Sequence, residues 1–138
     1  MRVTLPAGYR PSDSEPFMNP RQQEYFRQKL LRWKQELLEE SNMTLQSLQE
    51  ESLAQPDLAD RATAETDRSL ELRTRDRFRK LIGKIDSALR RLDDGSYGYC
   101  EDTDEPIPLK RLEARPTATL SVEAQERHER MERTKRDD

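Results

Sequence analysis

The fold is decided by residues 19–55, which read NPRQQEYFRQKLLRWKQELLEESNMTLQSLQEESLAQ and contain no glycine, and no proline after Pro20. Asn19 can accept from the free amides of a first helical turn, and Pro20 has no amide that needs a partner, so a helix is expected to begin here. Residues then recur at spacings of three and four, which places them on one helical stripe: Phe26, Leu30, Trp33 and Leu37, and again, after a gap, Thr44, Leu45 and Leu48.

A second helix follows a short break. Pro56 ends the first stretch, Asp57 offers a new N-cap, and Asp60 occupies the capping-box position three residues later. Gly95 supplies a stop signal for this helix. Apolar residues return at helical spacing before it, at Phe78, Leu81, Ile82, Ile85, Leu89 and Leu92.

Two long helices that each carry one apolar stripe must hide those stripes. The economical arrangement is an antiparallel coiled-coil hairpin over residues 19–94, with its tip near 54–62, and the expected fold class is mainly all-α. Pairing between two chains would satisfy the same pattern, because periodicity alone does not specify the partner. Side chains near the tip are small or polar, so the tip should be the least stable part of the hairpin.

The remaining segments have a different composition. Residues 1–18 contain three prolines and no helical period, which predicts a flexible N-terminal arm. Residues 95–120 are rich in turn-forming and aromatic residues and are expected to form a small knob of turns with up to two short strands. Ser121 can cap a last helix within 121–138, where four Glu–Arg pairs at i,i+4 support helix formation.

Composition excludes several classes of protein. Only 32% of the residues are hydrophobic and 38% are charged, which suits long helices with a narrow core. A DNA-coating protein would be basic overall, whereas this chain has a net charge of −3. One cysteine, one histidine and no glycine-rich loop leave no disulfide framework and no catalytic set, so the chain is not expected to be an enzyme. No membrane-spanning run or signal segment is visible, so a cytoplasmic protein is expected.

Five segments resemble the DksA/TraR family in order and spacing. The expected hairpin tip reads PDLADRA at 56–62, and SLELR and RKLI follow at 69–73 and 79–82. The knob reads GYCE at 98–101 and RLEARPTA at 111–118. Any one of these motifs would be weak, but together over a helical hairpin they are specific.

The resemblance implies a regulator that binds RNA polymerase. In that family the hairpin enters the secondary channel of the polymerase and its tip perturbs the active centre, which changes the stability of the open promoter complex. The active tip of the family matches Asp57, Asp60 and Ala62. Helix capping would account for both acids without any partner, and the two roles can coexist. Residues 50–67 carry a net charge of −5, which disfavours direct binding to nucleic acid, and no sequence-specific DNA binding is expected.

The resemblance also implies an effector, guanosine tetraphosphate (ppGpp). Leu81, Lys84 and Arg115 match positions that contact ppGpp in the family, where a further lysine falls on Gln125 of this chain. Residues 73–91 carry a net charge of +6, so a subset of them should touch an acidic protein surface or a phosphate group. Most of these basic residues are expected to be the solvated face of the hairpin.

The chain departs from the family at the zinc site. Of the four cysteines expected in the knob only Cys100 is present, and the other three positions hold Thr103, Ser121 and Ala124. Structural zinc requires four Cys or His ligands, and Cys100 with the distant His128 cannot supply them. The sequence therefore predicts a degenerate zinc-finger-like knob without zinc, held by packing.

Two alternatives to a channel regulator remain open. An acidic-tipped hairpin can position a catalytic Mg²⁺ for the polymerase's own hydrolysis, so a transcript-cleavage accessory factor would have a similar sequence. A coiled-coil oligomerisation protein would also show the stripes, and it would be oligomeric in solution, whereas a hairpin regulator should be a monomer.

Overall fold

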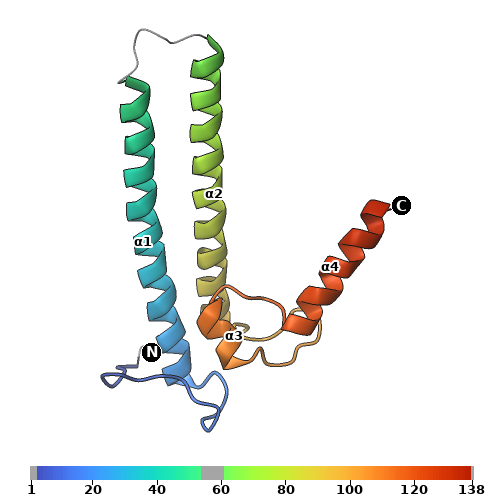
Figure 1. Cartoon of the computed structure of the whole chain (residues 1–138). Coiled ribbons are helices and arrows are strands. Elements are labelled where there is room, and N and C mark those ends of the chain that lie inside the picture. The colour runs from blue at the N-terminus through green and yellow to red at the C-terminus, as the bar shows by residue number, and fades with distance from the viewer. Residues whose placement is uncertain (1–2, 54–60, 138) are drawn as a thin grey trace. The chain divides into compact units, whose positions relative to one another are not determined.

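The computed structural model describes residues 3–53 and 61–137. Within these ranges the regular elements are the helices α1 (Pro20–Leu53), α2 (Arg61–Asp94), α3 (Leu109–Ala114) and α4 (Val122–Asp137), shown in Figure 1. The described residues contain no β-strand, only an isolated antiparallel bridge between Tyr99 and Pro106. The expected mainly helical fold class is therefore confirmed.

The chain divides into two compact units. One is Leu31–Asp86, and the other joins Met1–Leu30 to Ser87–Asp138. Each long helix contributes to both units, because the division falls within α1 and within α2.

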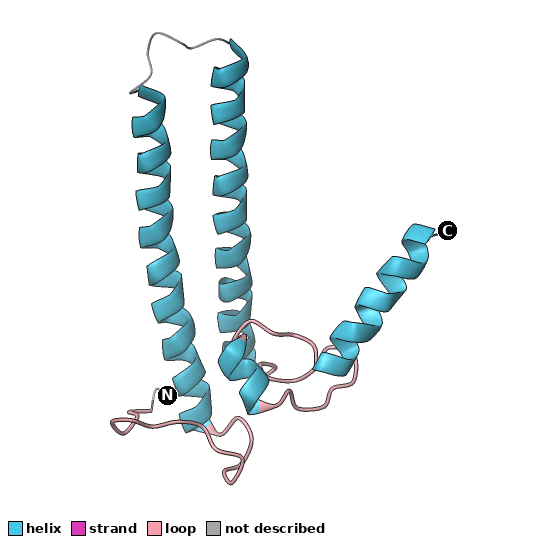
Figure 2. Ribbon diagram, in the orientation of Figure 1, coloured by secondary structure: helices cyan, strands magenta, loops and turns pink. Residues whose placement is uncertain are grey.

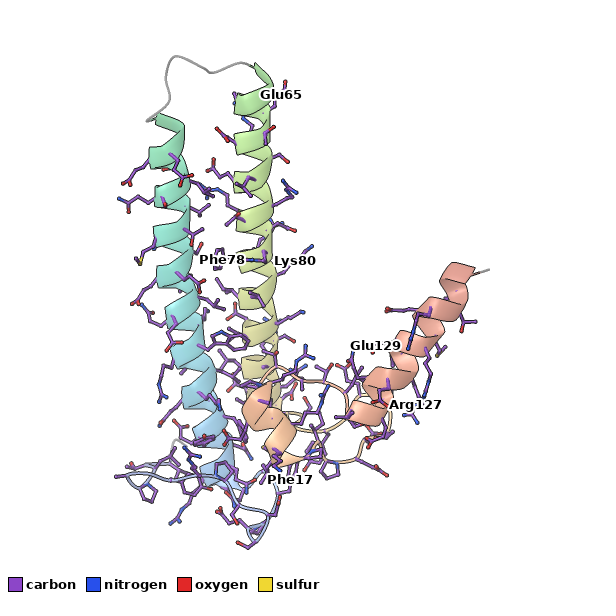
Figure 3. All side chains as sticks on the ribbon, in the orientation of Figure 1. Phe17, Glu65, Phe78, Lys80, Arg127 and Glu129 are labelled. Atoms are coloured by element: carbon purple, nitrogen blue, oxygen red, sulfur yellow. The ribbon has the colours of Figure 1, made fainter. Side chains whose placement is uncertain are left out.

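In the unit Leu31–Asp86, α1 and α2 run side by side in opposite directions (Figure 2). The predicted stripes meet here, because Leu37, Phe78 and Ile85 are all buried. Figure 3 shows Phe78 pointing from α2 toward α1, whereas Lys80 points away from it. Lys34 of α1 also contacts Asp86 of α2, with 2.7 Å between Nζ and Oδ1.

In the other unit, the core forms where the knob and the start of α1 pack together. Phe26 of α1 is fully buried, and its ring centroid lies 5.6 Å from that of Tyr97. The Tyr97 hydroxyl donates to the carbonyl of Pro116 at 2.7 Å. The other buried apolar residues of this core include Leu30, Ala88, Leu92, Cys100, Ile107, Leu112 and Ala124.

Three of the predicted helix ends are confirmed by their hydrogen bonds, whereas the ends predicted at Pro56 and Asp57 lie outside the described residues. Asn19 Oδ1 accepts the amide of Gln22 at 3.0 Å, which caps α1. Ser121 Oγ accepts the amide of Ala124 at 3.2 Å, which caps α4. After α2, Gly95 has a φ of +85°, and the next amide reaches back to the carbonyl of Arg91 at 3.0 Å. This is the six-to-one bond of a glycine-terminated helix.

The knob differs from the expectation in its regular structure. The two short strands are not found in the described residues of 95–120, where the Tyr99–Pro106 bridge is the only pairing. The helix α3 was not predicted. Its six residues bury Leu109 and Leu112, and a segment this short shows less than two turns of any period.

The arm before α1 packs on the knob in this structure. Met18 is buried, and atoms of Phe17 and Met18 approach the position that a Cβ at Gly98 would occupy to 3.2 Å. The ring centroid of Phe17 lies 5.4 Å from that of Tyr99, edge to face. The flexibility expected for residues 1–18 is not measured by these contacts and stays a prediction.

Candidate functional site

The four positions of the expected metal site come together in the knob. The thiol of Cys100 lies 3.8 Å from Ser121 Oγ, and its sulfur accepts the Ser121 amide at 3.5 Å. Thr103 also hydrogen-bonds to Cys100. Ala124 is fully buried one turn into α4, next to the Ser121 hydroxyl that its amide contacts. These pairwise contacts link the four positions through side chains of which only one is a thiol.

This cluster does not fit a zinc ion. It offers one thiol, two hydroxyl groups and one methyl group, whereas structural zinc is held by four sulfur or nitrogen ligands. Across the described part of the chain, no three His, Cys, Asp or Glu side chains are placed to hold a metal ion. The cluster is instead a small hydrogen-bonded core.

Hydrogen bonding perturbs the thiol in that core. Burial opposes ionisation of Cys100, but hydrogen bonds to the sulfur from Ser121, Thr103 and the Asp102 backbone outweigh it and lower the pKa to about 7. The thiol itself is buried, with 1% of the residue exposed. Next to it, His128 Nε2 of α4 lies 2.8 Å from Asp102 Oδ2, which ties α4 to the knob.

The residues expected to act at the hairpin tip lie in or next to the part of the chain that the structure does not describe. Asp57 and Asp60 lie outside the described residues, so their prediction is not tested. Ala62 belongs to the first turn of α2, and nothing is described of its side chain. Among the flanking acids, Glu65 and Asp67 are exposed, and Figure 3 shows Glu65 near the start of α2.

The residues expected to contact ppGpp are divided between the two units. Leu81 is half-buried and Lys84 is exposed on the next turn of α2, within Leu31–Asp86. Arg115 is exposed directly after α3, in the other unit. Among the described residues, neither Lys84 nor Arg115 forms an ion pair, so both cations are available to a ligand. Whether the three residues form one site stays a prediction.

The basic part of α2 has two flanks. Arg73, Arg77, Lys80 and Lys84 are all exposed, and their spacing of four, three and four places them on one face. Lys80 of this face binds Asp76 at 2.9 Å. On the other flank the arginines are also paired within the helix. Arg75 binds Glu71 at 2.9 Å and Arg79 binds Asp76 at 2.7 Å.

These pairs change the titration of the carboxylates involved. The Arg75 hydrogen bond lowers the pKa of Glu71, and the hydrogen bonds of Lys80 and Arg79 lower the pKa of Asp76. Both acids therefore stay ionised to a lower pH than an unpaired carboxylate would.

Sequence reasoning missed one feature of this flank, an open groove beside α2 that includes Phe78, Ile82 and Gly83. The only signal in the sequence was the glycine inside an otherwise helical pattern.

None of the described helices is long and apolar enough to cross a membrane.

Two family models match the chain in succession. Residues 22–92 match the N-terminal domain of the DnaK suppressor protein DksA. Residues 95–130 match the prokaryotic dksA/traR C4-type zinc finger, which is the segment that retains only one of the four cysteines.

Known proteins are similar over nearly the whole chain. The RNA polymerase-binding transcription factor DksA of Caulobacter vibrioides NA1000 is 72% identical over 130 residues, which are 94% of this chain and 92% of that protein. The protein of the same name from Escherichia coli K12 is 44% identical over 115 residues, 83% of this chain and 76% of that one. The solved structure of transcription factor DksA2 from Pseudomonas aeruginosa is 46% identical, with a TM-score of 0.74 over 87% of this chain and 95% of that one.

Proposed function

The chain belongs to the DksA/TraR family, and we propose from this that it regulates transcription by binding RNA polymerase. The observation that carries the proposal is the 72% identity, across 94% of the chain, to a protein named as an RNA polymerase-binding transcription factor. The long antiparallel helix pair supports it, because such a hairpin can carry its tip far into a narrow channel of a partner.

The hairpin is proposed to enter the secondary channel, as the family resemblance implies. Asp57, Asp60 and Ala62 then act at the polymerase active centre and change the lifetime of the open promoter complex. The regulator needs no catalytic group of its own, and no sequence-specific contact with DNA. The acidic charge of residues 50–67 supports this division, because it would repel a nucleic-acid backbone.

Guanosine tetraphosphate is proposed to strengthen the effect through Leu81, Lys84 and Arg115. The exposure of both cations, and their lack of carboxylate partners within the described chain, support this role. Gln125 stands where the family has a further lysine, and its amide donates to Glu129 at 3.3 Å, so the phosphate site has one cation fewer.

The knob is proposed to fold without zinc. The support is chemical, because Thr103, Ser121 and Ala124 are not zinc ligands in proteins of this kind, and packing among buried residues such as Tyr97 and Ile107 occupies the knob instead. The protein is further proposed to be a cytoplasmic monomer, since RNA polymerase is the partner and the two stripes pair within one chain.

Promoter-complex lifetime tests the proposed function. Purified protein and RNA polymerase are mixed on a promoter with an unstable open complex, with and without ppGpp, and decay is followed after adding a competitor. The protein should shorten the lifetime, and ppGpp should shorten it further. Absence of polymerase binding would refute the proposal, and binding with unchanged decay would refute its regulatory part. Cleavage of backtracked RNA on adding the protein would favour the transcript-cleavage alternative.

A further inference from the structure

Glu113 lies where α3 meets α1, within the unit that joins Met1–Leu30 to Ser87–Asp138. Its Oε2 atom accepts a hydrogen bond from the Tyr25 hydroxyl at 3.0 Å and another from Lys29 Nζ at 2.8 Å. Tyr25 and Lys29 are four residues apart in α1, so their side chains reach Glu113 from the same face of that helix. One carboxylate oxygen therefore joins α3 to the start of the hairpin, across 88 and 84 residues of sequence.

The position of Glu113 is not explained by the stability of α3 itself. Glu113 belongs to the last turn of this six-residue helix, where the helix dipole disfavours a negative charge. The side chains of Lys29 and Glu113 are 32% and 33% exposed, and ion pairs that remain partly in water usually contribute little to stability. The contact is therefore better suited to fixing the place of α3 than to stabilising the protein.

Arg115 follows two residues later, and its backbone is held on both sides. Its amide donates to the carbonyl of Arg111 at 2.7 Å, and its carbonyl accepts the amide of Ala118 at 2.9 Å. The next carbonyl, of Pro116, accepts the buried Tyr97 hydroxyl at 2.7 Å. The Arg115 side chain, by contrast, is exposed. A fixed backbone that carries an exposed guanidinium group is an arrangement suited to receiving a ligand.

The two sets of contacts complement one another. The hydrogen bonds of Arg115 fix its backbone within the knob, whereas Glu113 fixes α3 against α1. An arginine that binds a phosphate group loses affinity when its own position is mobile, because ordering it costs free energy at the moment of binding. Holding the backbone in advance removes part of that cost.

We propose that Glu113 is a positioning residue for phosphate recognition. By accepting from Tyr25 and Lys29 it anchors α3 to α1, and it thereby sets the place at which the Arg115 guanidinium meets the phosphates of ppGpp. Glu113 does not touch the ligand, because its carboxylate would repel a phosphate group. The inference rests on the proposed function, since it adds a residue to the same effector site.

Simple electrostatics predicts the opposite effect of removing this acid. Glu113 is a negative charge two residues from Arg115, and Glu113→Ala both removes that charge and releases the ammonium group of Lys29. If local charge alone mattered, both changes would strengthen the binding of an anion. A positioning role requires a weaker response to ppGpp in spite of the more positive surroundings, so the sign of the effect separates the two explanations.

The first test is a ppGpp titration of promoter-complex lifetime with RNA polymerase and saturating protein. The quantity compared is the ppGpp concentration that gives half of each variant's own maximal effect, so differences in the ppGpp-free lifetime do not enter. Glu113→Ala should raise this concentration about fivefold, the cost of ordering one long side chain on binding. Arg115→Ala should raise it about tenfold or more, because a charged hydrogen bond is lost outright.

The second test is a double variant, which gives a readout that a merely structural role would not move. In the Arg115→Ala background, Glu113→Ala should add little further shift, because the group that it positions is gone, whereas independent effects would add in full. Tyr25→Phe removes one of the two bonds to Glu113 and should raise the half-effect concentration about twofold.

Glu105→Ala is the matched control. It also removes one carboxylate from the knob, at an exposed position, and it should leave the half-effect concentration unchanged. An equal shift in this variant would overturn the inference, because the effect would then be general to lost negative charge.

The outcomes separate the positioning role from the effector site. If Glu113→Ala leaves the half-effect concentration unchanged or lowers it, or adds its full shift to that of Arg115→Ala, the inference is wrong. If Glu113→Ala does not fold, Tyr25→Phe decides, and an unchanged concentration in that variant overturns the inference. No response of the unmodified protein to ppGpp, or a normal response of Arg115→Ala, would instead refute the proposed effector site, and the inference with it.

Discussion

Alanine at Gly98 and alanine at Gly83 should change stability in opposite directions. Gly98 lies in the knob with a φ of +92°, and a Cβ there would come within 3.2 Å of Phe17 Cζ and of two Met18 side-chain atoms. Gly83 lies inside α2, where an added Cβ meets nothing within 4 Å. The same substitution therefore compares a strained, crowded backbone position with an open helical one.

The magnitudes follow from the two environments. A non-glycine residue at such a positive φ costs on the order of 1–3 kcal/mol, and the Met18 side chain must also shift by a few tenths of an ångström or lose its contact. Gly98→Ala should thus lower the free energy of unfolding by about 1–3 kcal/mol. Gly83→Ala should raise it by about 0.5–1 kcal/mol, the usual preference for alanine in a helix.

Urea unfolding, followed by far-ultraviolet circular dichroism, gives the free energy of unfolding of both variants and of the unmodified protein. The slope with urea should be unchanged, so that the midpoints report stability directly. Equal stability of Gly98→Ala and the unmodified protein would show that the arm does not pack on the knob as described. A shift of both variants in the same direction would refute the reasoning from backbone conformation.

Four further predictions concern the knob, the effector and the tip. A strong chelator should leave the melting temperature unchanged and metal analysis should find no zinc; one bound zinc per chain would contradict this. The pKa of the Cys100 thiol is lowered to about 7, so ionisation of this thiol should stabilise the fold fully above the unfolded thiol pKa of roughly 8.5, and this stabilisation should be lost as the pH falls through 7. Cys100→Ser should remove this pH dependence from the free energy of unfolding. An unchanged pH profile in that variant would refute the prediction. Lys84→Ala and Arg115→Ala should each lose the ppGpp-dependent part of promoter-complex decay, since a charged hydrogen bond contributes about 1.5–3 kcal/mol; normal responses would show that the site is misplaced. The double variant Asp57→Asn, Asp60→Asn keeps a side-chain acceptor at both positions, so it should lose at most about 1 kcal/mol of local stability. It should still bind polymerase but fail to shorten the lifetime of the promoter complex. Normal decay of the complex would show that both acids act only as helix caps.

The sequence by itself determined the helices α1, α2 and α4 and three of their ends. Asn19, Gly95 and Ser121 act on backbone groups within a few residues of themselves, so their capping roles can be read from neighbouring positions. The stripes of α1 and α2 are also local patterns, because each repeats with the helical period. Family membership followed from motifs spaced along the same chain, and the relatives confirm it.

Only the tertiary structure decided how distant segments meet. It places Ser121 against Cys100 and turns the degenerate metal positions into a hydrogen-bonded core. It packs Met18 beside Gly98 and forms α3 from a segment too short to show a period. These contacts join residues that are tens of positions apart in the chain. A sequence pattern with a helical period reveals which residues share a face of one helix, but it does not reveal which distant side chain will pack against them. The groove beside Gly83 depends in the same way on which flank of α2 the helix α1 leaves uncovered.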